Sequence, residues 1–97
     1  MDQNIEAILQ NREQTHGLYS VQSATSQRLK SLIWTSPNYQ TMPDHMREGL
    51  EMIQHKVARI VSGNAYERDH WVDIMGYAAL VLRELDQVQS GMGGENV

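Results

Sequence analysis

Apolar residues recur every three or four positions along most of this chain, a spacing that predicts α-helices. The periodic segments are separated by glycine, proline and other turn-forming residues. They cover residues 2–16, 20–34, 43–61 and 68–88. No segment alternates apolar and polar positions as a half-buried strand does. The sequence therefore predicts an all-α fold, a four-helix bundle-like domain.

Residues at the segment ends support these boundaries. Asp2 is a favourable N-cap for the first helix, and Gly17 is a residue type that commonly ends one. Pro43 stands where proline favours the first turn of a new helix. We expect residues 1–90 to form a single helical domain and residues 91–97, GMGGENV, to form a flexible C-terminal tail.

The last helix, residues 68–88, is apolar over more than half of its circumference, which indicates burial on more than one side. A chain of 97 residues has too little structure to surround such a helix by itself. We therefore expect assembly as a homodimer, with this helix in the interface. Its apolar residues are Trp71, Ile74, Met75, Ala78, Ala79, Val81, Leu82 and Leu85.

The helix over residues 43–61 has two contrasting faces. One is apolar, and the opposite one carries ionisable side chains within roughly 80° of arc. Those side chains are Glu48, Glu51, His55 and Arg59. Either this is a solvated face with ordinary pairs four residues apart, or Glu48 and Glu51 share a site for a hard divalent cation.

Asp73 stands at the head of a long apolar run, DHWVDIMGYAALVL, where an unpaired carboxylate is unfavourable. Two interpretations remain open from the sequence. Either Asp73 interacts favourably with the dipole at the start of its helix or pairs with Lys56 or Arg59, or it is a ligand of a metal ion.

Composition excludes several classes of protein. The chain has 12 acidic residues against 8 Lys and Arg, a formal net charge of -4, so it lacks the basic footprint of a duplex nucleic-acid binder. It contains 0 cysteines, which excludes disulfides and thiolate metal sites. Neither a signal peptide nor a membrane-spanning segment is visible. We expect a cytoplasmic protein with no membrane partner.

Two segments, REGLEMIQHKVARIVSGN and DHWVDIMGYAALV, resemble a family of small phage and prophage proteins without assigned function. The upstream segment NREQTHGLYS is similar to the N-terminal part of that family, although Leu18 stands where an acidic residue is common. The resemblance implies that the protein acts in the cytoplasm of a host bacterium.

A more distant resemblance implies a chemistry. The MazG-like all-α nucleoside triphosphate pyrophosphatases carry E-x-x-E on one helix and E-x-x-D on a later one, where carboxylates hold Mg²⁺ against the triphosphate. Here Glu48-Gly49-Leu50-Glu51 resembles the first motif, and His70-Trp71-Val72-Asp73, followed by Tyr77, resembles the second. The chain departs from that pattern at His70, because imidazole suits Zn²⁺, Mn²⁺ or a hydrogen-bonding role better than Mg²⁺.

This resemblance implies a set of site residues. The metal ligands would be Glu48, Glu51 and Asp73, holding Mg²⁺ or Mn²⁺. The nucleotide-binding residues would be Lys56, Arg59, His70 and Tyr77. Two functional hypotheses follow. In the first, the protein is MazG-like and binds a nucleotide with a divalent cation, acting as a pyrophosphohydrolase if catalysis is retained. In the second, it is a non-enzymatic phage accessory protein that binds and modulates a host protein.

Overall fold

The computed structural model describes residues 3–93, which form helices and connecting turns, with no strand among these residues. The helices are α1 (Gln3–His16), α2 (Tyr19–Trp34), α3 (Asp44–Ser62) and α4 (Arg68–Gly93), and a short 3₁₀ helix, η1 (Tyr39–Thr41), precedes α3. The predicted all-α class with four helices is confirmed.

The predicted N-cap of the first helix, Asp2, lies outside the described residues. The other predicted ends of the first three helices lie within one residue of the observed ones. The end of the last helix differs, because α4 continues to Gly93 rather than ending at residue 88. Glycine lowers helix propensity but does not forbid a helical conformation, so its presence alone marks no boundary. Part of the predicted tail is therefore helical, and residues 94–97 lie outside the described residues.

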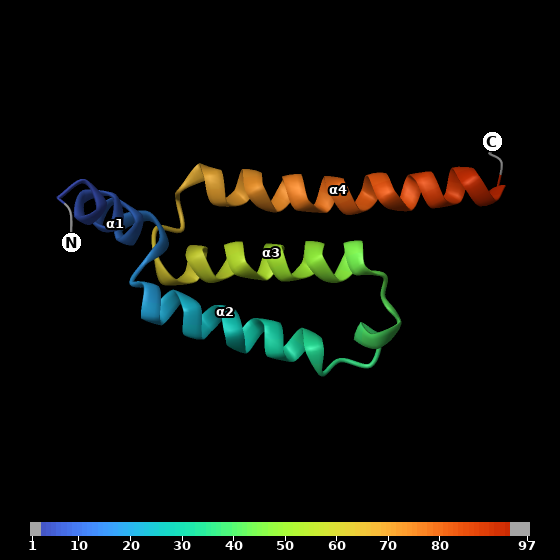
Figure 1. Ribbon diagram of the computed structural model, residues 1–97, viewed down its shortest axis with the longest axis horizontal. Coiled ribbons are helices and arrows are strands. Elements are labelled where there is room, and N and C mark those ends of the chain that lie inside the picture. Colours follow the sequence, from blue (N-terminus) through green and yellow to red (C-terminus); the bar gives the residue numbers. More distant parts are fainter. Residues whose placement is uncertain (1–2, 94–97) are drawn as a thin grey trace.

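The helix α3 lies between α2 and α4, and α1 packs across one end of α2 and α3 (Figure 1). The helices α2, α3 and α4 run antiparallel to their neighbours along the long axis, whereas α1 lies at one end (Figure 1). The molecule is elongated, with extents of 56 × 27 × 25 Å and a radius of gyration of 17.0 Å. A compact domain of this length has a radius of gyration of about 12.5 Å, so the single chain is far from globular.

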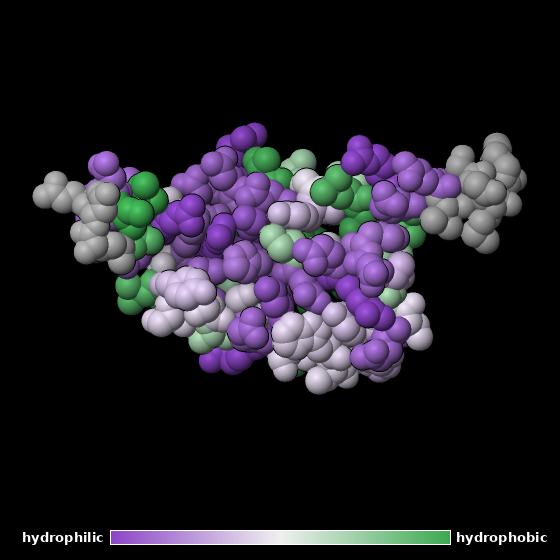
Figure 2. Space-filling model, in the orientation of Figure 1, coloured by the Kyte–Doolittle hydropathy of each residue, from purple (hydrophilic) through white to green (hydrophobic). Residues whose placement is uncertain are grey.

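The apolar core is small. Among the described residues, the buried hydrophobic side chains are those of Ala58 and Ile60, both on α3. Twice as many polar and charged residues are buried among the described residues, namely Gln22, Ser26, Lys56 and His70. Many apolar side chains are exposed instead, including several on α4 that appear along the edge of an otherwise hydrophilic face in Figure 2.

The junction between α1 and α2 touches the junction between α3 and α4. Gly17 has a φ of 85°, a left-handed conformation that favours glycine, and a Cβ there would lie 2.2 Å from the Ser62 carbonyl oxygen. A Cβ on Gly63 would lie 2.4 Å from the carbonyl carbon of His16. This backbone contact brings the end of α1 against the end of α3, and it positions the pocket described below.

Candidate anion-binding pocket

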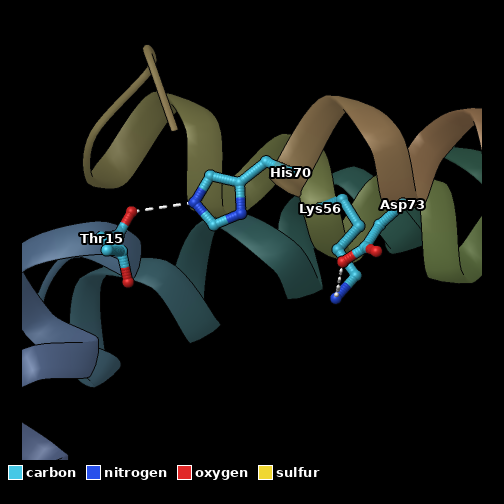
Figure 3. A network of polar contacts seen from close by, with 4 residues as sticks. All are labelled: Thr15, Lys56, His70 and Asp73. Atoms are coloured by element: carbon cyan, nitrogen blue, oxygen red, sulfur yellow. Dashed lines mark hydrogen bonds and ion pairs between the residues drawn. The ribbon is translucent and has the colours of Figure 1, made fainter. Parts of the chain in front are cut away.

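His70, near the start of α4, contacts the end of α1 at this junction. Its Nε2 lies 2.9 Å from the Thr15 carbonyl oxygen (Figure 3), and the backbone N–H of Asn64 donates to the same oxygen at 3.0 Å. Because a carbonyl oxygen only accepts hydrogen bonds, Nε2 carries a proton. His70 is 2% exposed and its ring lies 5.2 Å from that of His16. It therefore holds the start of α4 against the end of α1, and its Nε2 is not free for a ligand.

A pocket of about 450 Å³ opens beside this junction, between α1, α2 and α3. Its volume lies within the usual range for small-molecule sites. The lining residues are Leu9, Arg12, Glu13, His16, Gly17, Tyr19, Gln22, His55 and Arg59. Their positions span residues 9 to 59, so the pocket exists only because the fold brings three helices together.

The side chains of two arginines, Arg12 and Arg59, line this pocket. Burial lowers the pKa of Arg59, and the charge of Arg12 lowers it further, while Asp73 and Tyr77 act in the opposite direction. The Arg59 Nε is buried without a hydrogen-bond partner among the described residues. Two like charges close together are unfavourable unless an anion lies between them, so this pair favours a negatively charged ligand.

The pocket histidines add no charge at neutral pH. Burial lowers the pKa of His16 to about 4, helped by the charges of Arg59, His70, Arg12 and Lys56. Burial also lowers the pKa of His55, again with a contribution from Arg59. A neutral imidazole offers one donor and one acceptor, and the Nδ1 of His55 already lies 3.5 Å from the Ser26 Oγ, so the arginines supply the charge of the pocket.

Gln22 is the most buried polar residue of the pocket wall, at 4% exposed. Its side-chain amide makes no hydrogen bond to any residue in the described part of the chain. Buried polar groups in proteins are nearly always hydrogen-bonded to protein, water or ligand. The amide of Gln22 and the Nε of Arg59 are therefore two groups that a polar ligand in this pocket would satisfy.

Asp73 forms an ion pair with Lys56, with 3.1 Å between Oδ2 and Nζ (Figure 3). Of the two interpretations left open by the sequence, the structure shows the ion pair rather than a metal ligand. The two side chains differ in burial, since that of Lys56 is 11% exposed and that of Asp73 is 45% exposed. Loss of the ion pair is therefore more unfavourable for the charge of Lys56 than for that of Asp73.

This asymmetry predicts unequal effects of the two neutralising substitutions. Asp73→Asn should lower the free energy of unfolding by about 1–2 kcal/mol, because it leaves a buried ammonium group unpaired. Lys56→Met should change it by less than about 0.5 kcal/mol, because Asp73 is well hydrated and the methionine fills the same space. Urea denaturation of both variants measures this difference, and equal losses would contradict it.

Glu51 is engaged in a different contact. Its Oε2 accepts hydrogen bonds from the Tyr39 hydroxyl at 2.6 Å and from the Trp34 Nε1 at 3.0 Å. The hydrogen bond from Tyr39 lowers the pKa of the Glu51 carboxyl most, followed by that from Trp34. This carboxylate holds the end of α2 and η1 against α3, whereas Glu48 is exposed.

The metal site implied by the resemblance is not assembled within one chain. Glu51 and Asp73 each have other partners, and within residues 3–93 no group of three or more Asp, Glu, His or Cys side chains could hold a metal ion. Glu48, Glu51 and Asp73 therefore do not fit a shared Mg²⁺ or Mn²⁺ shell. Binding of Mg²⁺ or Mn²⁺ by the protein stays a prediction.

Of the four residues expected to bind a nucleotide, the structure places Arg59 in the pocket. Lys56 is paired with Asp73, and Tyr77 lines a separate hollow on α4. His70 is bonded to Thr15 and lines a further hollow together with Arg59 and Asp73. Sequence reasoning missed the residues contributed by α1 and α2, above all Arg12 and Gln22. Neither belongs to a motif with His55 or Arg59, and no local spacing indicates that they meet.

The structure thus defines a small all-α protein with a pocket lined by two arginines. The chain belongs to the DUF6378 family, a domain of unknown function, whose family model matches residues 1–84. Neither the curated proteins nor the solved structures include a match to this chain. Within the described part of the chain, no helix has the length and apolar character needed to cross a membrane.

Proposed function

We propose that this protein binds a nucleotide in the pocket between α1, α2 and α3. The observation that carries the proposal is that Arg12 and Arg59, whose Nε is buried without a partner among the described residues, line one pocket with Gln22, which is 4% exposed. Guanidinium groups bind phosphate oxygens through charge-assisted hydrogen bonds, often in pairs. A buried amide reads a flat polar edge, such as that of a nucleobase, by donating and accepting at once.

The remaining lining residues fit the other parts of such a ligand. Tyr19 is exposed at the pocket mouth and offers an aromatic face on which a base can stack. Leu9 supplies an apolar contact, and the Glu13 carboxylate is an acceptor for sugar hydroxyls. Phosphate, sugar and base each have a complementary group in this pocket.

The resemblance to MazG-like pyrophosphatases supports the same ligand class. The proposal concerns binding rather than hydrolysis, because the three carboxylates expected to hold the catalytic metal have separate environments here. Such a protein, if carried by a phage, would bind host or phage nucleotides during replication without consuming them.

Isothermal titration calorimetry tests the proposal. Three ligand types separate the contributions: a nucleoside triphosphate, the nucleoside without phosphates, and inorganic pyrophosphate, each with and without Mg²⁺. We expect saturable binding of the nucleotide at one site per chain, at least about 10-fold tighter than either fragment, because it engages both halves of the pocket. We also expect binding to persist without Mg²⁺, since the arginines supply the positive charge.

Two results would contradict the proposal. Absence of heat with any nucleotide of a panel covering the common bases would exclude nucleotide binding. Equal affinity for pyrophosphate and for every nucleotide would show that the pocket binds phosphate alone and that Gln22 and Tyr19 do not read a base.

A further inference from the structure

The helix α4 has a second apolar stripe beside the side that packs against α3. Its residues follow one another at intervals of four, three and four positions, the spacing of a helix seam that packs against another helix. They are Trp71, Met75, Ala78 and Leu82, and we call them the α4 seam. The larger members are well exposed in the single chain, with Trp71 at 53%, Met75 at 71% and Leu82 at 57%.

An apolar groove adjoins the seam. It has a volume of about 280 Å³, lies between α4 and the first half of α3, and shares Ala78 with the seam. Its other lining residues are Met42, Met46, Leu50, Ile53 and Val81. Seam and groove together form a continuous apolar surface, which is the signature of a macromolecular contact rather than of scattered exposed residues.

The exposed area of the single chain indicates how large that contact is. The chain exposes 6946 Å², whereas a folded monomer of 11.1 kDa exposes about 5,700 Å². The excess is larger than the roughly 800 Å² that each partner buries in an interface of standard size. Contact with one partner similar in size to this chain would account for the excess exposed area.

We propose that the α4 seam packs against the same seam of a second copy, with the two α4 helices antiparallel. In this arrangement Trp71 lies opposite Leu82 of the second copy, and Met75 lies opposite its Ala78. At the centre of the contact the long Met75 then packs against the small Ala78, the kind of size match that well-packed helix pairs require. A twofold arrangement also closes the assembly at two chains.

Charges at the two ends of the seam favour the antiparallel direction. Arg68 lies three residues before Trp71, and Asp86 lies four residues after Leu82, so both continue the seam face by one turn. Antiparallel packing places Arg68 near Asp86 of the second copy at both ends. Parallel packing would place like charges together, which disfavours association.

The mass in solution tests this surface with a matched pair of substitutions. Wild-type protein should have the mass of two chains in size-exclusion chromatography with light scattering. Leu82→Glu should weaken self-association about 100-fold or more, because it buries an unpaired charge in the contact. Leu80→Glu is the control, since Leu80 is exposed outside the seam. A monomeric wild-type protein, or equal effects of both substitutions, would overturn the proposal.

Disulfide cross-linking tests the direction and does not depend on a disruptive variant. The natural chain has 0 cysteines, so single introduced thiols report only the intended contact. A mixture of Trp71→Cys and Leu82→Cys proteins should give a heterodimer on oxidation, whereas neither protein alone should cross-link efficiently. Rapid cross-linking of each variant with itself would show parallel packing, and absence of any cross-link would contradict the contact. The seam is separate from the α1–α3 pocket, so these results leave the proposed function untouched.

Discussion

Replacing Gly17 with alanine is expected to lower the free energy of unfolding by about 3 kcal/mol or more. Two effects add at this position. The left-handed backbone with φ of 85° is unfavourable for a residue with a side chain, and the new Cβ would lie 2.2 Å from the Ser62 carbonyl oxygen. The clashing atom belongs to the backbone, so relieving the contact requires moving α1 away from α3. A loss of this size is a large part of the stability of a small domain.

Chemical denaturation at fixed protein concentration measures the effect, and Gly76→Ala is its control. Gly76 lies within α4, and a Cβ there has no heavy atom within 4 Å. The control should therefore gain about 0.5–1 kcal/mol from the higher helix propensity of alanine. A Gly17→Ala protein as stable as the wild type would show that the two junctions do not meet as described.

Arg59→Met is expected to change binding and stability in opposite directions. Binding of the nucleotide should weaken by about 10- to 100-fold, because a charge-assisted hydrogen bond to phosphate is lost. The free energy of unfolding should rise by up to about 1 kcal/mol, since the substitution removes a partly buried charge that faces Arg12. Methionine keeps most of the side-chain volume, so the packing of the arginine stem is preserved.

Arg28→Met is the matched control for this experiment. Arg28 is exposed on α2 and does not line the pocket, so neither affinity nor stability should change appreciably. Calorimetry gives the affinities and thermal unfolding gives the stabilities of both variants. If the Arg59→Met protein bound the nucleotide as tightly as the wild type, Arg59 would not contact the phosphate.

The helices were predictable from sequence because their signals are local. Apolar spacing gives each helix, and residues such as Gly17 and Pro43 mark ends that the structure reproduces closely. The predicted end of α4 was wrong, because Gly91 and Gly93 lower helix propensity without ending the helix.

The contacts of the ionisable residues were less predictable, because they depend on distant parts of the chain. A helical wheel places Glu51 on a polar face. It does not show that the fold brings Trp34 and Tyr39 close enough to donate hydrogen bonds to Glu51. For Asp73, sequence reasoning left open a metal ion or an ion pair with Lys56 or Arg59, and the fold shows the pair with Lys56. Arg59 was named as a phosphate ligand, whereas its neighbours from α1 and α2 share no motif with it.

The central claim is that Arg59 and Gln22 jointly bind a nucleotide in the α1–α3 pocket, and nuclear magnetic resonance tests it most directly. The side-chain amide of Gln22 and the Nε–H of Arg59 give separate signals in a ¹⁵N-labelled protein. Titration with a nucleotide should shift both signals with the same saturation curve and leave the signal of the exposed Arg28 unchanged. Saturable binding that leaves the signals of Gln22 and Arg59 in place would contradict the account.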